Sequence, residues 1–139
     1  MSEQARPLDT ARATSALLEA IAVMDELRSP GGCPWDAEQT HASLARYAIE
    51  EAHEVAEAAE AVDAGPGRSA PLVEELGDLL LQVLFHARIG QESDSEPFDI
   101  ADVADVLAAK LRRRHPHVFA AASARDAEQV RALWDDIKA

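Results

Sequence analysis

Hydrophobic residues recur at helical spacing along most of the chain, and proline and glycine interrupt the pattern at a few places. In the first such stretch Leu17, Leu18, Ile21 and Met24 repeat with a period near that of an α-helix. The breaks fall at "RSPGGCPWD", "DAGPG" and "HPH", where a helix cannot continue. Together these features predict four helices over about residues 9–27, 40–62, 71–90 and 99–114.

The remaining features point to an all-α protein. No stretch alternates between apolar and polar residues as a half-buried strand would. We therefore expect a four-helix bundle with a short C-terminal tail helix in "DAEQVRALWDDIKA". The chain is interpreted as a single domain over residues 1–139, with a flexible N-terminus at 1–8 and a tail at 115–139. Because the third helix is apolar on nearly every side, it should be central and should also contact a partner subunit in a homodimer or homotetramer.

Charge and composition exclude several classes of protein. The 139 residues include 26 acids and 13 bases, for a formal charge of -13, which argues against a nonspecific nucleic-acid binder. The lone Cys33, interpreted as a small buried residue, rules out an intramolecular disulfide and fits a reducing compartment. With neither a signal peptide nor a membrane span in view, we expect a cytoplasmic protein that does not contact membranes.

The second helix contains an acidic run without any lysine or arginine. "IEEAHEVAEAAE" has five glutamates, of which Glu50, Glu51 and Glu54 share one arc of the helix. Glu51 lies at the edge of the apolar stripe, whereas Glu57 and Glu60 fit a solvated face. Like charges one turn apart destabilise a helix by a few tenths of a kcal/mol unless a cation offsets them.

The third helix places a second acidic pair among leucines. Glu75 and Asp78 in "EELGD" are flanked by apolar residues on both sides, and no lysine lies within a turn. Buried carboxylates of this kind need a cation. Facing helices would combine both groups into an all-oxygen site that suits Mg²⁺, or Mn²⁺ as a substitute, formed by Glu50, Glu51, Glu54, Glu75 and Asp78.

Two other metals fit the residues less well. Zinc is disfavoured because a single cysteine and scattered histidines offer no zinc-ligand spacing. A di-iron bundle needs a Glu-x-x-His pair on two helices. Glu50 and His53 form one such pair, but the third helix has Glu75 and Asp78 at that spacing instead.

These motifs resemble a known family. "EEAHE" and "ELGD" are similar to the paired acidic signature of MazG-type nucleoside triphosphate pyrophosphohydrolases, and "GGCPWDAEQTHASL", "KLRRRHPHVF" and "LWDDIK" extend the resemblance in the same order. The resemblance implies an all-α, oligomeric enzyme that uses Mg²⁺ to cleave nucleoside triphosphates into monophosphate and pyrophosphate. It also implies metal ligands at Glu50, Glu51, Glu54 and Asp78, with Glu75 completing or supporting the cluster, and it leaves open which glutamate acts as general base.

Further residues are candidates for substrate contacts. The basic run that closes the fourth helix suggests phosphate contacts from Lys110 with Arg113 or Arg114, although some of its charge would simply offset the helix dipole. Trp35 fits either a nucleobase-stacking residue or a plug for the end of the bundle. The helical pattern predicts that His86 is a core histidine. Two alternative functions remain: a narrower hydrolase of dUTP-like or modified deoxynucleotides, and a helical interaction module without turnover.

Overall fold

The computed structural model describes residues 5–120 and 126–138, which form two compact units joined after Pro97. The first unit contains α1 (Thr10–Arg28), α2 (Pro34–Glu38), α3 (His41–Ala64) and α4 (Ser69–Gly90). The second contains α5 (Ile100–Arg114), α6 (Pro116–Phe119) and α7 (Ala127–Lys138). The described residues include no strand, so the all-α class is confirmed. That the chain is a single domain stays a prediction.

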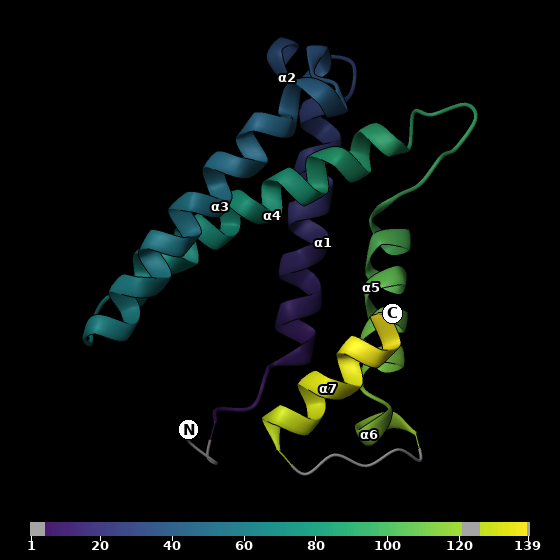
Figure 1. Cartoon of the computed structure of the whole chain (residues 1–139). Helices are drawn as coiled ribbons and strands as arrows, with labels where there is room; N and C mark the ends of the chain where they lie inside the picture. The colour runs from purple at the N-terminus through teal and green to yellow at the C-terminus, as the bar shows by residue number, and fades with distance from the viewer. Residues whose placement is uncertain (1–4, 121–125, 139) are drawn as a thin grey trace. The chain divides into compact units, whose positions relative to one another are not determined.

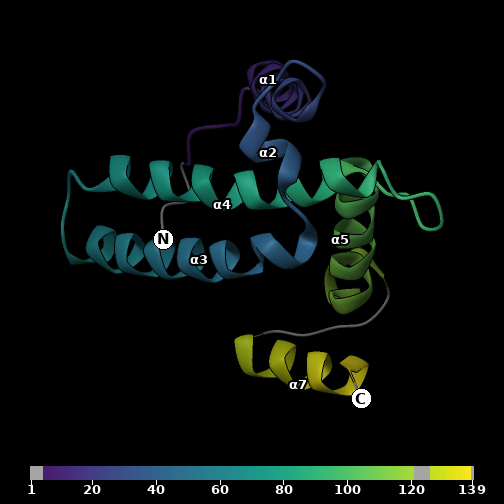
Figure 2. The ribbon, with the colours of Figure 1, turned by 90° about the horizontal axis from the view of Figure 1, so that it is seen from above.

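The first unit is built around an antiparallel pair of helices. α3 and α4 lie side by side, and α1 crosses α4 at a steep angle (Figures 1 and 2). The core of the unit is small, and its most deeply buried apolar side chains are Met24, Leu44, Leu84, Phe85 and Ala87. Leu44 of α3 is 1% exposed and Phe85 of α4 is 3% exposed, so one face of each helix is fixed against its neighbours.

Helix starts follow local hydrogen bonding at the caps. The Asp9 side chain accepts a hydrogen bond from the backbone N–H of Arg12 and begins α1. Thr40 with Ser43 and Asp99 with Asp102 form reciprocal capping boxes at the starts of α3 and α5. The predicted helix over residues 99–114 is therefore present, with Asp99 as its N-cap.

Arginine side chains connect α1 to the segments around it. Arg28, whose side chain is 8% exposed, donates hydrogen bonds to the backbone carbonyls of Asp36 and Gln39 at 2.6 and 2.9 Å. It also pairs with Glu92 at 2.8 Å, and Arg88 pairs with both Glu92 and Asp25. The hydrogen bond with Arg28 lowers the pKa of Glu92. This network joins the end of α1, the short α2 and the end of α4.

In the second unit, α5 contacts both α6 and α7. The Trp134 ring meets the ring of His115 edge-on, with centroids 4.9 Å apart, and Lys138 lies over its face. Trp134 thus holds the terminal helix against the end of α5.

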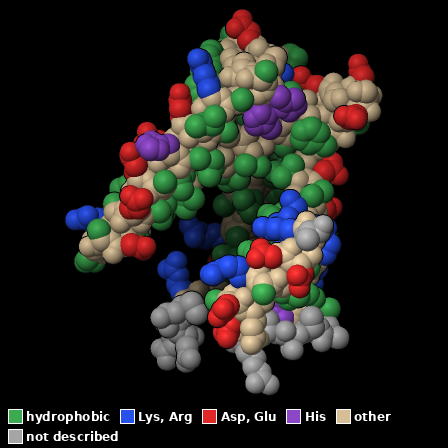
Figure 3. All heavy atoms as spheres, in the orientation of Figure 1, with side chains coloured by type: hydrophobic (Ala, Val, Ile, Leu, Met, Phe, Trp, Pro, Cys, Tyr) green, Lys and Arg blue, Asp and Glu red, His purple; other side chains and the backbone are tan. Residues whose placement is uncertain are grey.

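α1 and α3 leave part of the apolar surface of α4 uncovered, and the expectation that a partner subunit packs there stays a prediction. α4 contacts α1 and α3, yet Val73, Leu76, Leu80 and Leu81 are between 36% and 68% exposed. Hydrophobic side chains are visible on the surface of this helix pair beside a fringe of carboxylates (Figure 3). Among the described residues, no helix has the length and apolar character needed to cross a bilayer.

Candidate metal centre

Glu51 is positioned by the buried side of α3. It follows the almost fully buried Leu44 by seven residues, which is close to two helical turns, so the two side chains share a face. Glu51 is half-buried, in agreement with its predicted place at the edge of the apolar stripe. The face that packs α3 against α4 therefore also directs this carboxylate toward α4.

Glu75 and Asp78 are positioned by the corresponding face of α4. Asp78 lies one turn before the buried Gln82, and Glu75 lies a further three residues back. Because α3 and α4 are antiparallel, the acidic second and third turns of α4 come beside the middle of α3.

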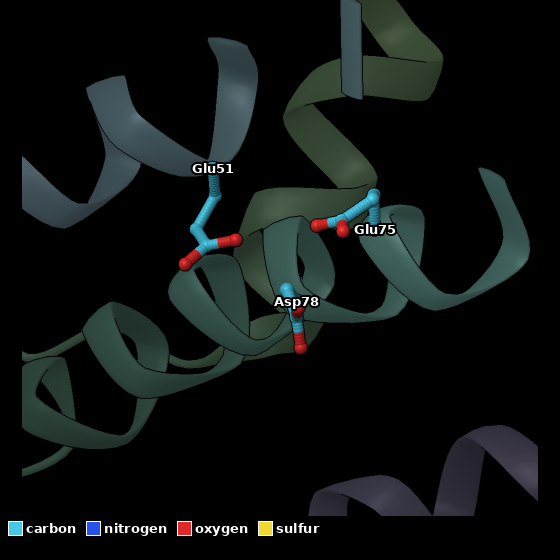
Figure 4. A group of neighbouring side chains, drawn as sticks. All are labelled: Glu51, Glu75 and Asp78. Carbon is cyan, nitrogen blue, oxygen red and sulfur yellow. The ribbon is translucent and has the colours of Figure 1, made fainter. Parts of the chain in front are cut away.

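The three carboxylates converge between the two helices (Figure 4). One oxygen from each of Glu51, Glu75 and Asp78 lies within 4.8 Å of the others. Three carboxylate oxygens at this separation suit a hard divalent cation that keeps several water ligands. None of the ion pairs among the described residues involves these side chains, so the donor set fits a metal ion.

Mutual repulsion shapes the electrostatics of the group. Partial burial, followed by the negative charge of Asp78, raises the pKa of Glu51 and of Glu75 above the ordinary glutamate value. The charge of Glu54 raises both pKa values further. A cation placed between the carboxylates would instead lower the pKa of Glu51 and of Glu75.

The other two predicted ligands lie at the margin of the cluster. Glu50 and Glu54 are exposed, and neither belongs to the group whose oxygens meet within 4.8 Å. Both still act on it electrostatically, since their charges contribute to the raised pKa of Glu51. Their role as ligands stays a prediction.

An aromatic group lies one helical turn from Glu51. The ring of Trp35 meets Tyr47 and Phe85 edge-on, with centroids 5.9 and 6.4 Å away. Trp35 remains 49% exposed, so it covers these rings without being buried itself. Its inner side packs on these rings, as a residue that closes the end of the bundle would, and its outer side is open for stacking on a nucleobase. The neighbouring Cys33, predicted as buried, is instead half-exposed.

The predicted phosphate contacts belong to the second unit. Lys110, Arg113 and Arg114 share one face of the last turns of α5, because they are three and four residues apart. Arg113 is exposed, whereas the Nε of Arg114 is buried without a hydrogen-bond partner among the described residues. Lys110 also borders an apolar groove lined by Phe98, Val103 and Leu107.

A histidine pair connects the start of α3 to α4. The Nδ1 atoms of His41 and His86 are 2.7 Å apart, and their rings are parallel within 5°. Partial burial and then His41 lower the pKa of His86. Periodicity identified His86 as facing inward, but no local pattern could have paired it with a residue 45 positions earlier.

Comparison with known proteins agrees with this geometry. Residues 39–119 match the MazG nucleotide pyrophosphohydrolase domain. This segment contains both helices that carry the carboxylate cluster. The chain belongs to the MazG family.

Similar proteins include both curated sequences and a solved structure. An uncharacterised 26.1 kDa protein of Streptomyces cacaoi is 50% identical over 88% of this chain and 48% of its own length. A nucleoside triphosphate pyrophosphohydrolase of Mycolicibacterium smegmatis is 49% identical over 88% of this chain and 36% of its own. The crystal structure of a MazG-related protein from Thermotoga maritima aligns with a TM-score of 0.62 and 28% identity, covering 89% of this chain and 97% of that one. The chain thus spans less than half the length of the curated relatives and nearly all of the solved MazG-related chain.

Proposed function

We propose that the chain is a nucleoside triphosphate pyrophosphohydrolase that uses Mg²⁺ to release pyrophosphate and the nucleoside monophosphate. Its proposed cellular task is clearance of unwanted nucleotides from the pool. The main support is the convergence of Glu51, Glu75 and Asp78 within the segment that matches the MazG domain.

The proposed reaction needs the carboxylates to work through a cation. Carboxylates repel a triphosphate, because both are anionic, so Glu51, Glu75 and Asp78 would hold the ion and leave part of its coordination shell to substrate and water. When bound, Mg²⁺ supplies charge neutralisation between protein and phosphate oxygens and lowers the pKa of a coordinated water. Mn²⁺ fits the same oxygen ligands.

The remaining chemistry falls to the chain's own side chains. Water attacks the α-phosphorus, the bond from that phosphorus to the bridging oxygen of the β-phosphate breaks, and pyrophosphate leaves. The proton from water passes to a carboxylate outside the direct ligand set, for which the marginal Glu50 and Glu54 are candidates.

Substrate contacts outside the cluster are part of the same proposal. Trp35 has its exposed side available for stacking on a nucleobase. Lys110, Arg113 and Arg114 offer positive charge for the phosphates from one face of α5.

Pyrophosphate release from a panel of nucleoside triphosphates tests the proposal directly. We expect release in Mg²⁺, none in excess EDTA, and recovery on adding Mn²⁺. Glu51→Gln should lower kcat/KM by about 100-fold or more, because it removes a direct ligand of the cluster. The matched control is Glu60→Gln, an exposed glutamate of the same helix, which should behave as wild type.

Other outcomes separate the alternative functions. Release confined to dUTP-like or modified deoxynucleotides would indicate the narrower hydrolase. Release of inorganic phosphate would mean that a different bond is cut. No release from any triphosphate, with Glu51→Gln identical to wild type in all binding measurements, would leave a helical interaction module.

A further inference from the structure

α3 carries only one arginine or lysine, and this residue, Arg46, precedes Glu51 of the carboxylate cluster by five residues. The helix has six acidic side chains against this single cation. α4 likewise has one, Arg88, which is paired with Asp25 and Glu92. None of the ion pairs among the described residues includes Arg46, despite the surplus of acids around it. Within the described part of the chain, Arg46 is thus the α3–α4 cation that forms no ion pair.

The Arg46 guanidinium is held in place by an aromatic side chain instead. Its central carbon lies 4.8 Å from the centre of the Tyr47 ring, and one Nη donates a hydrogen bond to the Tyr47 hydroxyl at 2.8 Å. Tyr47 in turn meets Trp35 edge-on at 5.9 Å. A guanidinium has five N–H donors, and the bond to Tyr47 uses one of them. The ring and this hydrogen bond orient the exposed group, while most of its donors can bind an anion.

Tyr47 connects Arg46 to the face of α3 that carries Glu51. Tyr47 precedes Glu51 by four residues, so the ring over which Arg46 folds shares the face of the cluster. Glu50 follows Arg46 by four residues and raises the pKa of Arg46, although less than the hydrogen bond with Tyr47 does. Along the helix axis Arg46 and Glu51 differ by about 7.5 Å, given a rise of about 1.5 Å per residue.

We propose that Arg46, stacked on Tyr47, binds the β- and γ-phosphates of the substrate and then the departing pyrophosphate. This inference rests on the proposed function, which places the α-phosphorus at the carboxylate cluster. The two outer phosphates carry most of the substrate's negative charge and need a cation away from the carboxylates. A planar guanidinium matches two phosphate oxygens at once, and stacking on a ring already limits the conformations that it would lose on binding.

Product inhibition separates a contact with the outer phosphates from other roles. We expect Arg46→Gln to raise both KM for the triphosphate and Ki for pyrophosphate by about tenfold or more, as loss of a charge-assisted hydrogen bond predicts. Ki for the nucleoside monophosphate should stay unchanged, because that product lacks the outer phosphates. Arg46→Lys should recover part of the loss, and Tyr47→Phe should have a smaller effect in the same direction. Arg12→Gln, an exposed arginine of α1, is the control.

Three results would overturn the inference. An active Arg46→Gln enzyme with wild-type Ki for pyrophosphate would remove Arg46 from the site and leave the proposed function intact. Equal rises in Ki for pyrophosphate and monophosphate would indicate a general structural effect. If the wild type shows no turnover, calorimetric titration with pyrophosphate and Mg²⁺ still decides: equal binding by wild type and Arg46→Gln, or binding by neither, contradicts the inference.

Discussion

At the scale of single residues, the carboxylate cluster has a cost for folding that depends on pH. The pKa of Glu51 and of Glu75 is raised in the folded protein above the ordinary value of 4.5. A folded state that holds protons more tightly than the unfolded state loses stability as pH rises through the raised pKa. Without metal, the contribution of these groups is therefore fully favourable below pH 4.5 and declines toward neutral pH.

Removing one charge should flatten this dependence. In EDTA, we expect Glu75→Gln to lose less unfolding free energy than wild type between about pH 5 and pH 8, because one repelling carboxylate is gone. Urea denaturation followed by circular dichroism measures the difference. Glu60→Gln, exposed on α3, should show the wild-type dependence. Identical slopes for wild type and Glu75→Gln would mean that the cluster is not under electrostatic repulsion.

A bound divalent ion should relieve the same repulsion. We expect Mg²⁺ or Mn²⁺ to raise the Tm of the wild type progressively with ion concentration, since an ion that binds only the folded state stabilises it. Asp78→Asn should shift this response to higher concentrations, whereas Glu60→Gln should not. A Tm that responds equally in both variants would place the ion elsewhere. Differential scanning fluorimetry at matched ionic strength measures the Tm at each ion concentration.

The sequence identified the cluster but not its boundary. Helical spacing placed Glu51, Glu75 and Asp78 on faces that could meet, and the structure brings all three together. Helical spacing could not separate these three residues from Glu50 and Glu54. An arc on a helical wheel does not show which side chains reach the neighbouring helix. The Arg46–Tyr47 contact was missed for a similar reason, since it depends on side-chain conformation.

At the scale of elements, the turn between α1 and α2 depends on a glycine without space for a side chain. A Cβ at Gly32 would lie 2.3 Å from the backbone oxygens of Glu26 and Leu27. We expect Gly32→Ala to lower the unfolding free energy by about 1–3 kcal/mol, because backbone atoms must move to make room. At Gly65, a Cβ would meet nothing within 4 Å, so Gly65→Ala should change stability by less than about 1 kcal/mol. Similar urea midpoints for both variants would contradict this account.

Arg28 should matter more for stability than an arginine normally does. Its buried guanidinium serves the carbonyls of Asp36 and Gln39 and the carboxylate of Glu92. Arg28→Met would leave these acceptors unpaired, and we expect a loss on the order of 3 kcal/mol in urea unfolding. The exposed Arg12 gives the control, since Arg12→Met should change stability by less than about 0.5 kcal/mol. A loss as small as that of the control would mean that water replaces Arg28 readily.

Long helices were predictable from the sequence, and short ones were not. The expected range 40–62 corresponds to α3 at His41–Ala64, and 71–90 corresponds to α4 at Ser69–Gly90. Hydrophobic periodicity needs several turns to be visible, so the five-residue α2 and the four-residue α6 gave no such signal. Each begins with proline at its first position, and in the sequence such a proline indicates only a break in the preceding helix.

At the scale of the whole molecule, a large negative charge opposes self-association while apolar surface favours it. Two chains of formal charge -13 repel each other, and added salt screens this repulsion. In the first unit, Leu18 of α1 is 60% exposed and Leu76 of α4 is 47% exposed. A homodimer or homotetramer would cover such side chains, and this assembly stays a proposal for the chain.

Salt dependence gives the proposed assembly a sharp test. If apolar burial drives association against charge repulsion, the dissociation constant should fall as NaCl rises, opposite to the response of an interface held by ion pairs. Leu18→Glu should weaken the assembly because it replaces exposed apolar surface by charge. Ala16→Glu adds the same charge about 160° away around α1 and should weaken it less. Sedimentation velocity at low micromolar protein concentration measures the oligomeric state. A monomer at every salt concentration would contradict the proposal, because the exposed leucines would then not be used for self-association.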